Sequence, residues 1–164
     1  QLGGNRCGGA AMMEFATFLF QGLAAFVGTI AFAVLFHVPR QQYLWAGVTG
    51  CLGWLCYLLM NRLTVSTVIA SFIATLLLTA VSRFFAVWRR TPITIFLVCG
   101  IFPLVPGEGI YYTAYYFMMG DTAAAGDWGT QALKIAIAIS LGIVVILSLP
   151  QKLFRVLLHR QEEA

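Results

Sequence analysis

Long apolar runs, almost free of charge, constrain this sequence more than any other feature. Of its 164 residues, 60% are hydrophobic and only 10% are charged, whereas a soluble domain has roughly 45–50% apolar and about 25% charged residues. A helix needs about 20 apolar residues to cross the roughly 30 Å of bilayer hydrocarbon. Because several runs reach that length, the sequence predicts an all-α integral membrane protein with membrane lipid as its first partner.

Polar and proline-containing stretches divide the apolar sequence into about five transmembrane helices. The predicted spans are residues 12–36, 43–60, 67–87, 92–119 and 130–149, with a polar loop at residues 120–129. Residues 151–160 alternate apolar with basic side chains, a pattern typical of a short amphipathic helix in the interface plane. We therefore predict a single transmembrane domain over residues 1–164, with a flexible start at 1–11 and an interfacial tail at 150–164.

Basic residues are distributed unequally between the two ends of the five predicted spans. One end collects Arg40, Arg83, Arg89, Arg90, Lys152, Arg155 and Arg160. The other end mixes both signs, with Arg6, Arg62, Lys134, Glu14, Asp121 and Asp127. Because cytoplasmic loops carry an excess of Lys and Arg, we expect the N-terminus outside and the C-terminus in the cytoplasm. The formal charge of +4 then reflects this loop bias, and no basic run interleaved with aromatic residues indicates a nucleic-acid partner.

Catalytic and metal-binding patterns are missing from the sequence. It contains neither a glycine-rich phosphate loop ending in Gly-Lys-Ser/Thr nor a His-Glu-x-x-His zinc pair. His37 and His159 lie at span ends, away from any recognisable nucleophile motif. The spacing of Cys51 and Cys56 is not that of a zinc pair, so we interpret the cysteines as packing residues. We expect no enzyme activity, no cofactor and no metal.

Two prolines interrupt the fourth span, in the stretch IFPLVPGEGIYYTAYYFMM at residues 101–119. Pro103 and Pro106 each remove a backbone donor and clash with the preceding turn, so a continuous helix is unfavourable here. An unbroken helix over the 28 residues of this span would measure about 42 Å, more than the bilayer. Irregular backbone at membrane depth is tolerated only where protein or a water-filled cavity surrounds it. We therefore predict that the fourth helix is broken at this Pro-x-x-Pro-Gly motif, beside a functional site.

A helix that restarts at Gly107, Glu108 and Gly109 offers a binding site for a small charged substrate. Its free N–H groups and positive dipole end attract a carboxylate, as the discontinuous helices of transporters do. Carbonyl groups freed just before the break can receive an ammonium group. An amino acid would use both devices, and a dicarboxylate would use only the first.

Glu108 is the sole acid of the fourth span, and it is our candidate for proton coupling because a glutamate at low dielectric tends to hold its proton. Three tyrosines share its helical face, three, four and seven residues further on. The predicted substrate-binding residues are Pro103, Pro106, Gly107, Glu108, Gly109, Tyr111, Tyr112 and Tyr115. The alternative is that Glu108 stabilises the helix dipole and that the tyrosines form an interfacial aromatic belt.

Hydroxyl residues recur at helical spacing along the third predicted span. They are Ser71, Thr75, Thr79 and Ser82. Such hydroxyl groups either bond the backbone of their own helix or line a polar surface, and the spacing leaves both interpretations open.

The broken stretch also carries a resemblance to a known family. The segment FPLVPGEGIYYTAYYFM resembles the signature of the threonine/serine exporter family, and GTIAFAVLFHVPR resembles the small-subunit domain of the same family. The similarity covers roughly residues 15–150, and the residues that match the motif are Pro103, Pro106, Gly107 and Tyr112. Glu108 departs from the small or apolar residue that is common in the family at this place.

The resemblance implies a bacterial inner-membrane secondary exporter that is driven by the proton motive force. In the family this domain is fused to a larger membrane domain or forms a small subunit beside a larger one. Members export threonine and serine or, in one branch, succinate. We therefore expect a larger membrane subunit or a second copy as partner, and a small carboxylate-bearing metabolite as substrate.

A non-catalytic subunit that assembles a larger transporter is the alternative that the sequence leaves open. Two stripes of small residues are candidates for its contact with a partner, because small residues permit close helix packing. They are Gly47, Gly50 and Gly53 in the second span and Ala132, Ala136 and Ser140 in the fifth.

Overall fold

A computed structural model of the chain describes residues 4–64 and 66–149. This part consists of α-helices and two short 3-10 helices, and no strand occurs in it. In chain order the elements are α1 (Gly4–Leu35), η1 (Arg40–Gln42), α2 (Tyr43–Leu63), α3 (Thr67–Arg89), α4 (Ile93–Ile101), η2 (Phe102–Leu104), α5 (Gly107–Met118) and α6 (Thr122–Ser148). The predicted all-α fold is confirmed.

Four segments are long and apolar enough to cross a membrane, and a bent pair of helices makes a fifth candidate. The four are Ala16–Leu35, Arg40–Leu63, Thr67–Arg89 and Thr122–Ser148, and the pair is Ile93–Leu104 with Gly107–Met118, bent by 50°. The five predicted spans therefore correspond to the observed helices, and the fourth one is broken at its proline-containing stretch.

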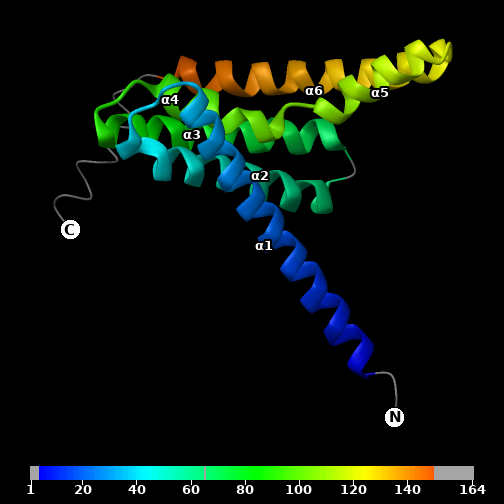
Figure 1. Cartoon of the computed structure of the whole chain (residues 1–164), viewed down its shortest axis with the longest axis horizontal. Coiled ribbons are helices and arrows are strands. Elements are labelled where there is room, and N and C mark those ends of the chain that lie inside the picture. The colour runs from blue at the N-terminus through cyan, green and yellow to red at the C-terminus, as the bar shows by residue number, and fades with distance from the viewer. Residues whose placement is uncertain (1–3, 65, 150–164) are drawn as a thin grey trace.

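Helix α3 occupies the centre of the bundle. Half of its membrane-spanning window is buried, against 22–28% for the other three long spans. Helices α2, α3 and α6 run side by side, and the part of α1 nearest the N-terminus projects away from them (Figure 1). The hairpin of α5 and α6 extends past the connection between α2 and α3 (Figure 1). This arrangement leaves α5 packed mainly on α6.

Both ends of the described chain differ from the expected boundaries. Helix α1 begins at Gly4 rather than at residue 12, so most of the expected flexible start is helical. A helix extends readily once it is nucleated, and no proline stops it before residue 12. The expected interfacial tail at residues 150–164 lies outside the described residues.

The prediction of a polar loop at residues 120–129 is wrong, because α6 already begins at Thr122. Gly120, at φ +82°, reverses the chain in the short turn between α5 and α6. Asp121 then caps the new helix by accepting a hydrogen bond from the backbone N–H of Ala124 at 3.0 Å. This local capping overrides the polar composition from which the loop was predicted.

The glycine stripe of α2 is buried within the chain itself. A Cβ atom at Gly50 would lie 2.0 Å from Thr29 Oγ1 of α1, and one at Gly53 would lie 2.5 Å from Leu78 Cδ1 of α3. Gly47 faces α1 in the same way. These glycines let the three helices approach closely. The stripe is therefore an internal contact rather than the seam for a separate partner that the sequence left open.

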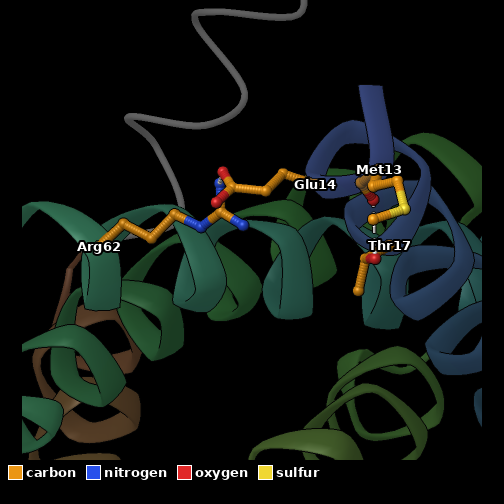
Figure 2. A network of polar contacts seen from close by, with 4 residues as sticks. All are labelled: Met13, Glu14, Thr17 and Arg62. Carbon is orange, nitrogen blue, oxygen red and sulfur yellow. Dashed lines mark hydrogen bonds and ion pairs between the residues drawn. The ribbon is translucent and has the colours of Figure 1, made fainter. Parts of the chain in front are cut away.

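An exposed ion pair joins α1 and α2 at the end of the bundle that carries the turn between α2 and α3 (Figure 2). Arg62 Nη1 lies 3.4 Å from Glu14 Oε2, and the two side chains are 55% and 69% exposed. One turn along α1, Thr17 Oγ1 donates to the carbonyl of Met13 at 2.8 Å. A pair this exposed contributes only about 0–1 kcal/mol, so the tight glycine contacts matter more for holding α1 on α2.

Candidate substrate site

The fourth span breaks where α4 passes into the 3-10 turn η2. The N–H of Val105 closes this turn on the carbonyl of Phe102 at 3.2 Å. The backbone then leaves helical geometry, with ψ at 131° for Val105 and 60° for Pro106. Because Pro103 and Pro106 have no N–H, neither can donate to the ladder of hydrogen bonds that would join α4 to α5. The bend of 50° follows from this local chemistry.

The first turn of α5 presents open backbone donors. Gly107 donates its N–H to the carbonyl of Val105 at 2.7 Å. The N-cap residue Pro106 supplies no side-chain cap, so the amides of Glu108 and Gly109 are first-turn donors without an intrahelical acceptor. Together with the helix dipole, such donors attract negative charge.

A cavity of about 480 Å³ lies between this break and helices α2, α3 and α6. Its lining consists of Trp54, Tyr57, Thr67, Ser71, the break residues 103–109, Trp128, Gln131, Ala132 and Ile135. These residues belong to the second half of α2 and the first halves of α3 and α6. The cavity therefore occupies the half of the bundle nearest the turn between α2 and α3, which we call the cavity end. Its volume is in the range of small-molecule sites.

The lining combines one carboxylate with several neutral polar groups. Glu108 is the one charged side chain among the described lining residues. The neutral polar groups are the hydroxyls of Tyr57, Thr67 and Ser71 and the amide of Gln131. The rings of Trp54 and Tyr57 lie 5.2 Å apart between centroids, and aromatic faces attract cations. This set of groups suits a small ligand that carries an ammonium group.

Apolar side chains close the inner end of the cavity. Leu104 of η2 is only 5% exposed and belongs to a buried cluster at this level. The buried members of the cluster are Ala74, Leu78, Leu97, Leu104, Ile135 and Ile139. The cavity therefore ends within the bundle and is separated from the opposite end by packed hydrocarbon.

The five residues that the sequence predicts at the break all line the cavity, namely Pro103, Pro106, Gly107, Glu108 and Gly109. Gly107 faces open space, because a Cβ there would meet no heavy atom within 4 Å. At Gly109 a Cβ would lie 3.0 Å from the Cβ of Ala132. Gly109 is thus needed for the close approach of α5 to α6, whereas Gly107 leaves room in the cavity.

The three predicted tyrosines lie further along α5, apart from the described lining. Tyr112 packs on Trp128 of α6, with ring centroids 4.8 Å apart. Tyr111 stacks on Tyr115 at 6.3 Å, and both rings are exposed. Each turn of α5 carries the chain about 5.4 Å further from the break, so sharing a helical face with Glu108 does not bring these rings into the cavity.

Sequence reasoning missed the contributions of α2 and α6 to the lining. Trp54 and Tyr57 give no signal of their own, since aromatic residues in a span more often face lipid or the interface. Trp128 fell within the predicted loop, and a single amide such as Gln131 matches no motif. Ser71 gave a weak signal as the first of the regularly spaced hydroxyl residues in α3. The missing information was the rotation of each helix about its axis.

The two ends of the bundle differ in charge. The end opposite the cavity, which we call the arginine end, carries Arg40, Arg83, Arg89 and Arg90. No acidic residue lies at that end in the part of the chain that the structure describes, since Glu14, Glu108, Asp121 and Asp127 all lie toward the cavity end. Broken helices beside a polar cavity are typical of secondary transporters. Fold and cavity together define a helical membrane transport protein.

Comparison with known families agrees with this class. The family model of the threonine/serine exporter ThrE matches residues 21–149, which include the broken span and every helix that lines the cavity. The chain belongs to the threonine/serine exporter family, and the resemblance seen in the sequence is confirmed. No solved structure matches the chain.

Proposed function

We propose that this chain carries a small amino acid of the threonine/serine type across the membrane and binds it in the cavity beside the broken span. The substrate carboxylate lies at the first-turn amides of α5, and the ammonium group lies between Glu108 and the aromatic rings of the lining. The observation that carries this proposal is the position of Glu108, which lines the cavity directly beside the open donors of α5.

An amino acid fits this lining better than a dicarboxylate such as succinate. Both substrates can place one carboxylate at the start of α5. The second carboxylate of a dicarboxylate would then face Glu108, and the described lining contains no basic side chain to receive it. Like charges at close range disfavour ionisation of both groups. We therefore expect discrimination against dicarboxylates.

The cellular setting that we propose is the bacterial inner membrane, with the arginine end in the cytoplasm. The excess of arginine at that end supports this orientation. The N-terminus and the cavity then lie toward the outside, and the C-terminus lies inside. We also propose that the proton motive force drives export and that the chain acts as a small subunit. Its partner is a larger membrane subunit of the same family or a second copy.

Counterflow in proteoliposomes tests the proposed function. We expect exchange of labelled serine or threonine, and little exchange of succinate, by the chain with its larger subunit. The chain alone is measured in parallel. Succinate exchange without serine exchange would contradict the amino-acid site. If neither substrate moves in either preparation, the exporter proposal fails and the role of an assembly subunit is left.

The variant Gly107→Leu tests the location of the substrate. The chain can fold with leucine at this position, because a Cβ there meets no other heavy atom within 4 Å. The leucine side chain then occupies part of the cavity, since Gly107 faces open space within the lining. We expect serine counterflow to fall by roughly ten-fold or more, with membrane insertion unchanged. Gly126→Leu is the matched control, since a Cβ there also meets nothing within 4 Å and Gly126 lies outside the lining. Equal activity of the two variants would place the substrate elsewhere.

A further inference from the structure

The hydroxyl residues of α3 form one continuous buried line that starts at the cavity. We call this line the hydroxyl column, and it consists of Ser71, Thr75, Thr79 and Ser82. Ser71 is 2% exposed and belongs to the cavity lining, and the other three are completely buried. Because these positions are three or four residues apart, they share one face of α3. The column therefore runs from the cavity, past the apolar cluster, toward the arginine end.

Backbone bonding alone does not explain why these hydroxyl groups are buried. Ser71, Thr75 and Thr79 each donate to the carbonyl four residues earlier, at 2.7–2.8 Å. Ser140 of α6 makes the same bond at 2.9 Å on an exposed face, so the bond does not require burial. Ser82 Oγ is buried without a hydrogen-bond partner among the described residues. A buried polar atom left without a partner needs an explanation beyond packing.

Small residues of α6 cover the hydroxyl column near Thr75, and Ile135 and Ile139 pack beside it. At Gly142 a Cβ would lie 3.0 Å from the Cβ of Thr75 and 3.3 Å from the carbonyl oxygen of Phe72. Ala138 of α6 is also buried in this region of the bundle. Small residues let two helices approach closely, so few side-chain atoms lie between α3 and α6 at Thr75. Separation here would expose the hydroxyl groups, which water solvates, together with part of the apolar cluster that holds Ile135 and Ile139 of α6.

At the far end of the column, Arg83 holds the end of α6. Its guanidinium Nη1 donates to the carbonyls of Ile146 and Leu147, and the side chain is only 7% exposed. The last carbonyls of a helix lack the usual intrahelical donor four residues on and carry partial negative charge, although that of Ile146 also accepts from the N–H of Leu149 at 3.3 Å. A carboxylate is a stronger acceptor for arginine than a carbonyl group is. A carboxylate that arrives at the arginine end can therefore compete with α6 for Arg83.

We propose that the interface of α3 and α6 forms the half of the transport route between the cavity and the arginine end, and that Arg83 receives the substrate carboxylate there. In the structure this half is closed, because α6 lies on the hydroxyl column. Binding of the carboxylate by Arg83 releases the end of α6, and the column then lines a hydrated path to the cavity. The proposal rests on the proposed function, since it assigns a route to the same substrate.

A reversible cross-link tests whether α3 and α6 must separate. A Cβ at Gly142 would lie 3.0 Å from the Cβ of Thr75, so a disulfide, with its Cβ atoms about 3.5–4.5 Å apart, needs only a small outward shift. Thr75→Cys with Gly142→Cys is therefore made in a variant whose native cysteines are replaced. We expect oxidation to lower serine counterflow at least ten-fold and reduction to restore it. Binding of serine to the cavity, read from the fluorescence of Trp54 and Trp128, should persist.

A matched cross-link between α1 and α2 is the control. In the same background, but with Cys51 kept, Gly22→Cys is added, because a Cβ at Gly22 would lie 3.5 Å from Cys51 Sγ. We expect oxidation of this pair to leave counterflow unchanged. Full activity of the oxidised Thr75–Gly142 pair would overturn the proposed route. Inactivity of the parent variant with its larger subunit would instead count against the proposed function.

Substitutions without any cross-link provide an independent measurement. Thr75→Val and Thr79→Val keep the shape of the side chain and remove the hydroxyl, so we expect counterflow to fall several-fold, whereas Ser140→Ala should have no effect. We expect Arg83→Gln to raise KM for serine about ten-fold on the arginine side of the membrane alone, and Arg83→Lys to raise it much less. If Arg83→Lys and Arg83→Gln raise KM equally on both sides of the membrane, Arg83 only caps the end of α6 and does not bind the substrate.

Discussion

The carboxylate of Glu108 lies at the start of α5, within the same helical turn as the amides that we propose for the substrate carboxylate. At the scale of single residues, our proposal is that this pairing decides which ligand the cavity prefers. The adjacent donors alone would bind any small anion. The acidic side chain adds a requirement for a positive group a short distance away, which amino acids meet and dicarboxylates do not.

Replacement of Glu108 by glutamine tests this requirement. The variant Glu108→Gln keeps the size of the side chain but removes its charge, and a hydrogen bond to a charged group contributes about 1.5–3 kcal/mol. We expect KM for serine to rise roughly ten-fold or more. The control is Asp127→Asn, which changes an exposed acid of α6 outside the lining and should leave KM unchanged.

The pH dependence of transport separates the two roles proposed for Glu108. If the residue also carries the coupled proton, the Glu108→Gln variant loses the pH dependence of counterflow that the unmodified chain shows. An unchanged KM together with an unchanged pH profile would leave Glu108 with the helix-dipole role that the sequence also allows.

At the scale of elements, the break between α4 and α5 creates the cavity. Restoring a continuous helix would carry α5 along the axis of α4, and the wall formed by residues 103–109 would be lost. The prolines impose this conformation, since each removes a donor from the helical ladder. The bend is therefore a local property of a few residues, even though its consequence is a cavity between four helices.

The double variant Pro103→Ala with Pro106→Ala is expected to straighten the fourth span. Serine counterflow should be lost, while the melting temperature should not fall, because proline within a helix costs about 3 kcal/mol relative to alanine. Pro92→Ala, at the N-cap of α4, is the control outside the break. Normal counterflow by the double variant would show that the break is unnecessary for transport.

At the scale of the whole molecule, the asymmetry of charge between the ends sets the proposed orientation. The arginine end collects Arg40, Arg83, Arg89 and Arg90, and the cavity end holds the acids of the described chain. In this orientation the tight interface of α3 and α6 lies in the cytoplasmic half of the membrane, and the cavity lies in the outer half. In the proposed route, export then begins at Arg83 and ends at the cavity.

Labelling of single cysteines in intact cells tests the orientation. In a variant without the native cysteines, we expect Asp127→Cys to react with a membrane-impermeant maleimide. Arg90→Cys should react only after the membrane is permeabilised. Both side chains are exposed in the structure, so access to the reagent, rather than burial, determines the result. The opposite pattern would reverse the orientation and place the cavity in the cytoplasmic half.

The membrane-spanning helices and the break could be predicted because they depend on short-range properties. The length of an apolar run decides whether a helix can span, and the missing N–H of Pro103 and Pro106 acts within one turn. The wrong prediction of a loop at residues 120–129 also concerns short-range properties. One cap at Asp121 and one turn at Gly120 were enough to make an Ala-rich polar stretch helical.

The sequence alone determined the class of the protein, its span pattern and the backbone part of the candidate site, because hydrophobic length and proline geometry act within single helices. Tertiary structure decided which faces meet. It brought Trp54 and Gln131 to the cavity, separated Tyr115 from it, and buried the glycines of α2 against α1 and α3. These outcomes depend on the rotation and crossing of helices, which are set by contacts between residues distant in the sequence.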